Sequence, residues 1–82
     1  MLYVLGKEIE SERFEWTVFE DRARATECFD EAAYVVRNAP GDGPGDDPII
    51  VTAAFLYAAD TSVRSAAETM ARSGRATLIA QE

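Results

Sequence analysis

Carboxylates are concentrated in the first half of the sequence. Residues 8 to 31 hold nine acids and three arginines, a local balance of 3 − 9 = −6. The acids are Glu8, Glu10, Glu12, Glu15, Glu20, Asp21, Glu27, Asp30 and Glu31. Aromatic and β-branched residues, among them Phe14, Trp16 and Val18, are interleaved with them, which is not typical of a disordered acidic tail. We therefore expect a folded element with carboxylates on its outer surface.

Catalysis is not indicated by these carboxylates. Paired acids can hydrolyse glycosides, but the pattern places these acids on exposed positions and indicates no cleft that would shift a pKa. The sequence contains no histidine, which excludes Ser-His and Cys-His nucleophiles and histidine metal ligands. The only cysteine, Cys28, falls on an apolar helix stripe, where a small buried residue is expected rather than a reactive thiol. We predict a protein that is not an enzyme and has no cofactor.

Residues 39–48, APGDGPGDDP, contain all three prolines and three of the five glycines. This composition predicts a mobile loop within one domain. Its acids, Asp42, Asp46 and Asp47, supply oxygen ligands, but their spacing does not match an EF-hand and no bidentate glutamate follows. We therefore predict no metal site.

The net charge of −7 is unevenly placed along the chain. Residues 1–47 hold twelve acids and five bases, whereas residues 48–82 hold three of each. Nucleic acids and anionic membranes call for basic patches, so neither is expected as a direct partner. A basic protein or nucleoprotein complex is favoured instead, although negative charge also serves solubility alone. No secretion signal is recognised and the longest apolar run is too short for a bilayer, which predicts a cytoplasmic location.

Six elements are expected, in the order ββαβαβ. Strands are predicted at residues 2–5 and 14–18; the second alternates apolar and polar residues, with its apolar face inward and Glu15 outward. A helix is predicted over 22–38, begun by Glu20 and Asp21 as caps. Residues 49–59 are compatible with a helix, but a buried central strand is preferred because the run is apolar on both faces. A second helix with the stripe Val63, Ala66, Ala67, Met70 and Ala71, capped by residues 60–62 and ended by Gly74, precedes a final strand at 75–81.

These elements predict a single α+β domain spanning residues 1–82. Its sheet has about four strands, and two helices pack on it. On such a scaffold, neighbouring carboxylates on a helix lie roughly 6 Å apart, and alternate residues of a strand roughly 6–7 Å apart. Both spacings are close to that of phosphates along a nucleic acid strand, so a DNA-binding protein would meet a substitute polyanion.

The predicted partner-binding surface is built from two groups of acids. If residues 8–12 are extended, Glu8, Glu10 and Glu12 project on one side. Glu15, Glu27, Asp30 and Glu31 continue the row if the second strand and first helix are adjacent. Tyr34 is the preferred aromatic anchor at the rim, whereas Trp16 is expected to pack in the core.

The run EIESERFEWTVFEDRARATECFDE and the loop GDGPGDD, in a short acidic chain without histidine, resemble the small inhibitors encoded by phages and mobile elements, notably anti-CRISPR proteins. The resemblance is compositional and covers the first half of the chain. It implies an inhibitor that acts in the cytoplasm of a bacterial host cell, binds basic subunits of a CRISPR effector complex and blocks access of target DNA.

Two other functions stay open. The chain is alternatively a structural or assembly module that forms a homodimer or hetero-complex through apolar surface and a sheet edge. A small-molecule-binding regulatory domain is less supported, because no ligand motif is present.

Overall fold

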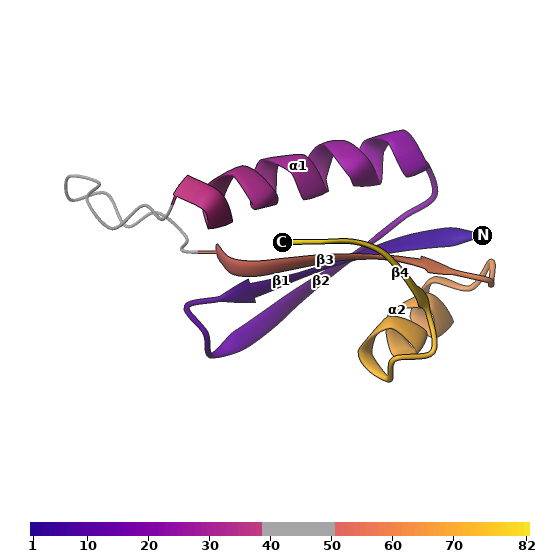
Figure 1. Cartoon of the computed structure of the whole chain (residues 1–82). Helices are drawn as coiled ribbons and strands as arrows, with labels where there is room; N and C mark the ends of the chain where they lie inside the picture. The colour runs from indigo at the N-terminus through magenta and orange to yellow at the C-terminus, as the bar shows by residue number, and fades with distance from the viewer. Residues whose placement is uncertain (39–50) are drawn as a thin grey trace.

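A four-stranded antiparallel sheet organises the molecule, and a computed structural model describes it over residues 1–38 and 51–82. The elements are β1 (Leu2–Ile9), β2 (Arg13–Phe19), α1 (Arg22–Asn38), β3 (Val51–Ala59), α2 (Arg64–Arg72) and β4 (Thr77–Gln81). In space the strands run β2-β1-β3-β4. Figure 1 shows α1 on one side of this sheet and α2 on the other. The predicted order ββαβαβ and the α+β class are confirmed.

Helix α1 covers one face of the sheet and forms the larger core. Asp21 begins it as predicted, because its side chain Oδ1 accepts a hydrogen bond from the Ala23 N–H at 3.0 Å, which satisfies a donor left free in the first turn. Ala25, Phe29, Ala32 and Ala33 are its buried residues. Their partners from the sheet are Leu5, Ile9, Val51, Ala54 and Leu56. The alanines let the helix lie close to the strands, and the larger sheet residues fill the space between the two layers.

Strand β3 lies between β1 and β4, as the predicted central strand, and the helical alternative for residues 49–59 is not adopted over the described part, Val51–Ala59. Leu56 packs in the core under α1, whereas its neighbour Tyr57 packs on the opposite face with Leu2 and Val4. Successive side chains of a strand point to opposite faces. An apolar run is therefore what a strand covered on both sides requires.

Helix α2 is short and begins differently from the prediction. Val63 is its N-cap residue, and no side chain caps the helix there; the Thr61 hydroxyl instead accepts a bond from the Val63 N–H at 3.1 Å. Val63 was expected to join the buried stripe, but it is 54% exposed. The helix ends as predicted, because Gly74 adopts a φ of +79°, a conformation that glycine takes at little cost.

Strand β1 is longer than predicted, since it continues through Gly6 and Lys7 to Ile9. Pairing to β2 on one side and β3 on the other holds this stretch extended despite its polar residues. The predicted loop at 39–48, with its aspartates, lies outside the described residues. Within the described parts, neither helix has the length and apolar character needed to cross a membrane.

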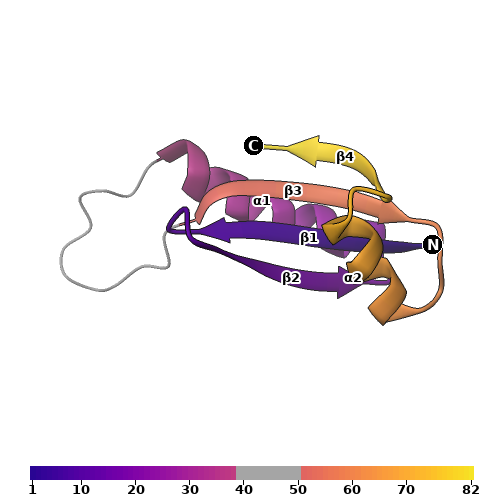
Figure 2. The ribbon, with the colours of Figure 1, turned by 90° about the horizontal axis from the view of Figure 1, so that it is seen from below.

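The two faces of the sheet are covered to different extents. Viewed from the α2 side, the 17-residue α1 runs behind the length of the sheet, while the 9-residue α2 crosses it near one end (Figure 2). The residues packed with α2 are Leu2, Val4 and Ala59, at the start of β1 and the end of β3. Over the other half of this face, the sheet carries side chains that no described helix covers.

Candidate protein-binding surface

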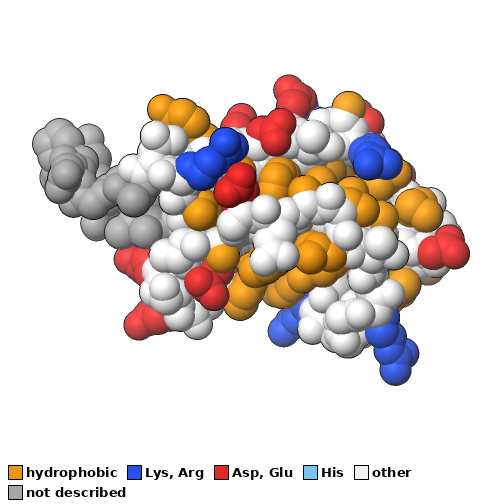
Figure 3. Space-filling view, viewed as in Figure 1, with side chains coloured by type: hydrophobic (Ala, Val, Ile, Leu, Met, Phe, Trp, Pro, Cys, Tyr) orange, Lys and Arg blue, Asp and Glu red, His pale blue; other side chains and the backbone are white. Residues whose placement is uncertain are grey.

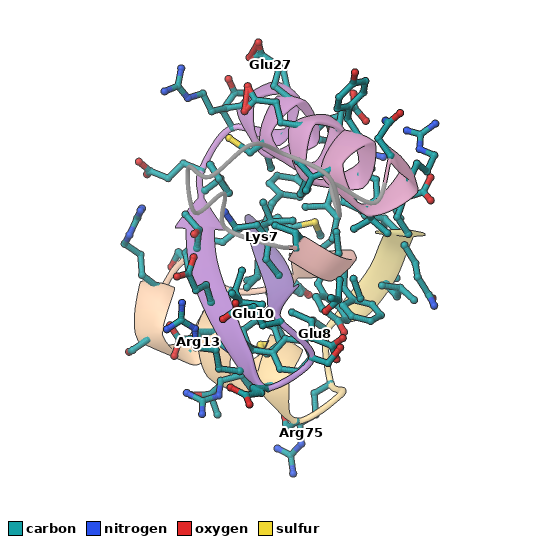
Figure 4. The ribbon with its side chains drawn as sticks, turned by 90° about the vertical axis from the view of Figure 1, so that its left-hand side faces the viewer. Lys7, Glu8, Glu10, Arg13, Glu27 and Arg75 are labelled. Carbon is teal, nitrogen blue, oxygen red and sulfur yellow. The ribbon has the colours of Figure 1, made fainter. Side chains whose placement is uncertain are left out.

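The outer side of α1 carries a compact group of exposed residues: Glu27, Asp30, Glu31 and Tyr34. Residues three and four positions apart are neighbours on a helix surface, so each member lies beside at least two others. We call these four residues the α1 carboxylate patch. Glu27 points away from the sheet in Figure 4, as expected opposite the buried Ala25 and Phe29. The predicted grouping of these four residues follows directly from the helix.

No ion pair neutralises the carboxylates of this patch within the described residues. The ion pairs there join Arg37 to Glu82 at 3.3 Å and Arg72 to Glu68 at 3.2 Å. Arg37, the basic residue in the last turn of α1, is therefore directed to the end of the chain and not to Asp30 or Glu31. Among the described residues, no cationic side chain therefore lies within ion-pair distance of these three carboxylates.

Glu15 lies at the flank of the helix layer, but a lysine interrupts the predicted row. Glu15 pairs with Lys7 across β1 and β2, on the face that α1 covers. Lys7 also lines a hollow of about 270 Å³ together with Glu31 and Cys28. One positive charge thus stands between Glu15 and the α1 carboxylate patch. Cys28, which also packs against the core, is half-buried.

Glu8, Glu10 and Glu12 do not form the predicted extended row. Glu10 and Ser11 have positive φ angles of 54° and 58° in the tight turn between β1 and β2, and the chain reverses there. The Thr52 hydroxyl donates a 2.7 Å hydrogen bond to Glu8 Oε1 and accepts one from the Ser11 N–H at 3.1 Å. In Figure 4 the turn lies across the sheet from Glu27. Glu8, Glu10 and Glu12, which we call the turn acids, are therefore a second acidic site, separate from the α1 carboxylate patch.

Sequence reasoning missed a cluster of four aromatic side chains on the α2 side of the sheet: Phe14, Trp16, Phe55 and Tyr57. The ring centroids of Phe14 and Trp16 lie 5.5 Å apart, those of Trp16 and Tyr57 6.3 Å, and those of Phe14 and Phe55 6.2 Å. These separations are in the range of favourable aromatic pairs. We call the four rings the aromatic quartet. Its members come from β2 and β3, which β1 separates, so only the strand order brings them together.

The aromatic quartet lines a groove of about 630 Å³, which we call the aromatic groove. Its other lining residues are Ala71, Arg72 and Gly74 at the end of α2, and Glu12 and Arg13 at the β1–β2 turn. Phe14 is 45% exposed and Trp16 is half-buried. The prediction that the apolar face of β2 packs inward is therefore wrong at its Phe14 end, because α2 is too short to reach it. Glu15 is exposed, as predicted, although it lies on the α1 side.

Gly6 is what allows Trp16 to lie across the sheet. It pairs with Trp16 on one side and with Phe55 on the other. A Cβ atom at Gly6 would stand 2.7 Å from Trp16 Cζ3, which is closer than real carbon atoms approach. The indole therefore rests over bare backbone between β2 and β3. A glycine in a central strand commonly marks such a close approach, and this is the signal from which the quartet might have been recognised.

In the described part of the chain, no three histidine, cysteine or acidic side chains are grouped closely enough to hold a metal ion. The chain matches no protein-family model, no curated protein and no solved structure. The described surface carries four features that could contact a partner: the α1 carboxylate patch, the turn acids, the aromatic groove and the sheet edges.

Proposed function

We propose that this protein is a non-catalytic inhibitor that binds a basic nucleic-acid-binding protein through the α1 carboxylate patch and blocks its access to DNA. The partner supplies lysines and arginines that otherwise contact phosphates. Glu27, Asp30 and Glu31 substitute for those phosphates, and Tyr34 provides an aromatic contact beside them.

One observation carries this proposal: three adjacent carboxylates stand on a capped, well-packed helix without a counter-ion among the described residues. Like charges four residues apart, such as Glu27 and Glu31, disfavour a helix by a few tenths of a kcal/mol. The buried side of α1 offsets that cost, so the charges are held in a fixed arrangement. A rigid charged surface binds with less loss of conformational entropy than a flexible acidic tail.

The CRISPR effector complex is the partner class implied by the resemblance to anti-CRISPR proteins. Its channels for guide and target strands are positively charged, which fits an acidic ligand. Of the acids in the predicted row, the α1 carboxylate patch is the part we assign to this contact. Glu8 is held by Thr52 and Glu15 lies beside Lys7, so these two are expected to contribute less.

Capture from a bacterial lysate with three immobilised baits tests the proposal. The first bait is the wild-type chain and the second carries Glu27→Lys, Asp30→Lys and Glu31→Lys. The third is a control with Glu10→Lys, Glu20→Lys and Asp60→Lys, which changes the net charge equally at exposed sites and leaves the patch intact.

The expected result is a basic protein retained by the wild type and the control, lost from the patch variant, and released by salt. Added duplex DNA should displace it, because DNA and the patch would compete for the same cations. Equal capture by all three baits, or capture that DNA does not affect, would contradict the proposal.

A second function, an assembly module, is favoured by the β4 edge of the sheet. Residues Thr77–Gln81 include no charged residue and no proline, and Leu78 and Ile79 are 45% and 36% exposed. The opposite edge, β2, carries Arg13 and Glu15, and such charges protect an edge from pairing. An extended segment of another protein could add to β4. The change Ile79→Lys should abolish such binding and leave capture through α1 unchanged.

A further inference from the structure

The aromatic groove is an apolar site that the function proposed above does not use. Its four rings touch one another and the sheet on one side, and Phe14 is 45% exposed on the other. An exposed cluster of large apolar residues with charged residues at its rim is typical of a protein contact. Tryptophan and tyrosine at the centre of such a cluster are the residues that most often dominate binding energy.

The surface beside the groove changes height abruptly where α2 ends. Helix α2 adds a second layer over one half of this face, and the other half is bare among the described residues (Figure 2). Packed sheets are separated by roughly 10 Å, which is about the diameter of a helix. A second copy can therefore place the uncovered half of its own sheet over the uncovered half of this sheet. Its sheet then lies at the same height above this sheet as α2 does. A two-fold axis through the groove then brings the β1–β2 turn of each copy against the end of α2 of the other.

The charges at the two ends of the groove suit this arrangement. Glu8, Glu10 and Glu12 against Arg13 give the turn end a balance of 1 − 3 = −2. The α2 end has Arg72 and Arg75 against Glu68, a balance of 2 − 1 = +1. Figure 3 shows carboxylates at the turn end and arginines beside α2, with apolar side chains between them. A two-fold axis superposes the acidic end of one copy on the basic end of the other, as a self-complementary interface requires.

We propose that the aromatic groove binds a second copy of this chain, with Phe14 and Trp16 at the centre and Glu12 of each copy facing Arg72 of the other. In each copy both Glu12, from the β1–β2 turn, and Arg72, from the last turn of α2, line the groove, and Arg72 also pairs with Glu68 of its own helix. The aromatic quartet is smaller than a standard interface, so association is weak and depends on concentration, in roughly the micromolar range. The α1 carboxylate patch lies on the opposite layer and stays accessible in this dimer.

Sedimentation velocity and tryptophan fluorescence, measured over the same concentration series, test the dimer. Trp16 is the only tryptophan, so its emission reports directly on the groove. The average mass should rise toward that of two chains, and the emission should shift to shorter wavelength over the same range. The change Phe14→Ser should weaken association by about tenfold or more, as expected for a central aromatic contact. The matched control is Tyr34→Ser, which removes an exposed aromatic residue from the opposite layer. It should leave self-association unchanged, whereas capture of a basic partner through the α1 carboxylate patch should weaken.

The charge contact has a test that does not depend on loss of an apolar residue. E12R and R72E should each self-associate less than the wild type, because each dimer would oppose like charges. An equimolar mixture of the two variants should associate again, since both contacts are then between opposite charges. Circular dichroism confirms that each variant is folded.

Three outcomes would overturn the proposal. The first is a single-chain mass at every concentration up to the solubility limit. The second is a dimer that Phe14→Ser leaves intact and Ile79→Lys abolishes, which would assign the contact to the β4 edge. The third is a mixture of E12R and R72E that associates no better than either variant alone. All three leave lysate capture through α1 unaffected, so the dimer and the proposed inhibitor function fail separately.

Discussion

The two faces of the sheet divide the molecule into a covered acidic layer and a half-open aromatic layer. On one face the 17-residue α1 buries Leu5, Ile9 and Leu56, and turns its carboxylates to solvent. On the other, the 9-residue α2 covers Leu2 and Val4 and leaves the aromatic quartet accessible. Both faces are apolar, so hydrophobicity does not separate buried core from accessible surface here. The length of the helix that covers each face does.

This difference shows that a buried core and an accessible aromatic groove follow from the same strand pattern. Successive residues of β3 alternate between the closed core and the open groove: Leu56 is 2% exposed, while Phe55 and Tyr57 are half-buried. In the sequence, these residues form a single apolar run with no sign of which face each one occupies. Substitutions on the two faces should therefore have different consequences for stability and association, and the following predictions are ordered by the size of the expected effect.

The largest effect is expected on the covered face. Leu56→Ala should lower the free energy of unfolding by about 2–5 kcal/mol, because it leaves a cavity under α1. The adjacent Phe55→Ala should cost about 1 kcal/mol, since its side chain is only half-buried and has less apolar contact to lose. Urea denaturation of the two variants measures the contrast. Equal losses would mean that the open face is packed as tightly as the core.

A substitution at Gly6 should disturb the packing of Trp16 on the α2 side of the sheet. Gly6→Ala should lower the free energy of unfolding by about 1–3 kcal/mol, because the new Cβ would overlap Trp16 and overpacking has this cost. The emission of Trp16 should change with it. Gly74→Ala is the control: its cost of about 1 kcal/mol comes from the positive φ, and nothing lies within 4 Å of the added atom. If both variants left the emission unchanged, the indole would not rest on Gly6.

The helix cap should have a smaller effect, confined to the covered face. Asp21→Ala removes the acceptor for the Ala23 N–H and should cost about 1 kcal/mol. Asp21→Asn retains an acceptor and should recover most of that loss. Denaturation followed by circular dichroism measures both. An unchanged midpoint for the alanine variant would show that solvent satisfies the end of α1 equally well.

The smallest effect on stability is expected within the α1 carboxylate patch. Glu27→Lys removes the repulsion with Glu31 and should raise the free energy of unfolding by a few tenths of a kcal/mol. This gain should shrink at high salt, where exposed charges are screened. A loss of stability would instead indicate that Glu27 makes a favourable contact, and the patch would then be part of the fold.

The local sequence pattern was sufficient to predict the helices and strands, but not which helix covers each face of the sheet or how much of that face it covers. The helix at residues 22–38 is confirmed to the residue, and of the two predicted caps, Glu20 and Asp21, the capping bond is made by Asp21. A capping carboxylate followed by a 3.6-residue stripe is a local signal. The central strand is confirmed because its apolar run has two faces to bury. The start of α2 was missed because the Thr61 hydroxyl bonds to the N–H of Val63, and Val63 itself is the N-cap residue.

The candidate site was predicted where it lies on one element and not where it spans several. Glu27, Asp30, Glu31 and Tyr34 are neighbours by helix geometry alone. The row through Glu8, Glu10 and Glu12 was not formed, because two positive φ angles turn the chain within it. The aromatic quartet depends on β1 inserting between β2 and β3, and on α2 stopping short. Neither strand order nor helix coverage is visible in the pattern of one strand.

The most direct test of the central claim is the affinity of the wild type, the α1 patch variant and the charge-matched control for a lysine oligopeptide, measured calorimetrically at increasing salt. If Glu27, Asp30 and Glu31 act together as a surface for cations, the patch variant should lose about tenfold or more in affinity. The control should lose much less, and the wild-type affinity should fall steeply with salt. Equal losses in the two variants would mean that net charge alone attracts the peptide, and the α1 carboxylate patch would then have no special role.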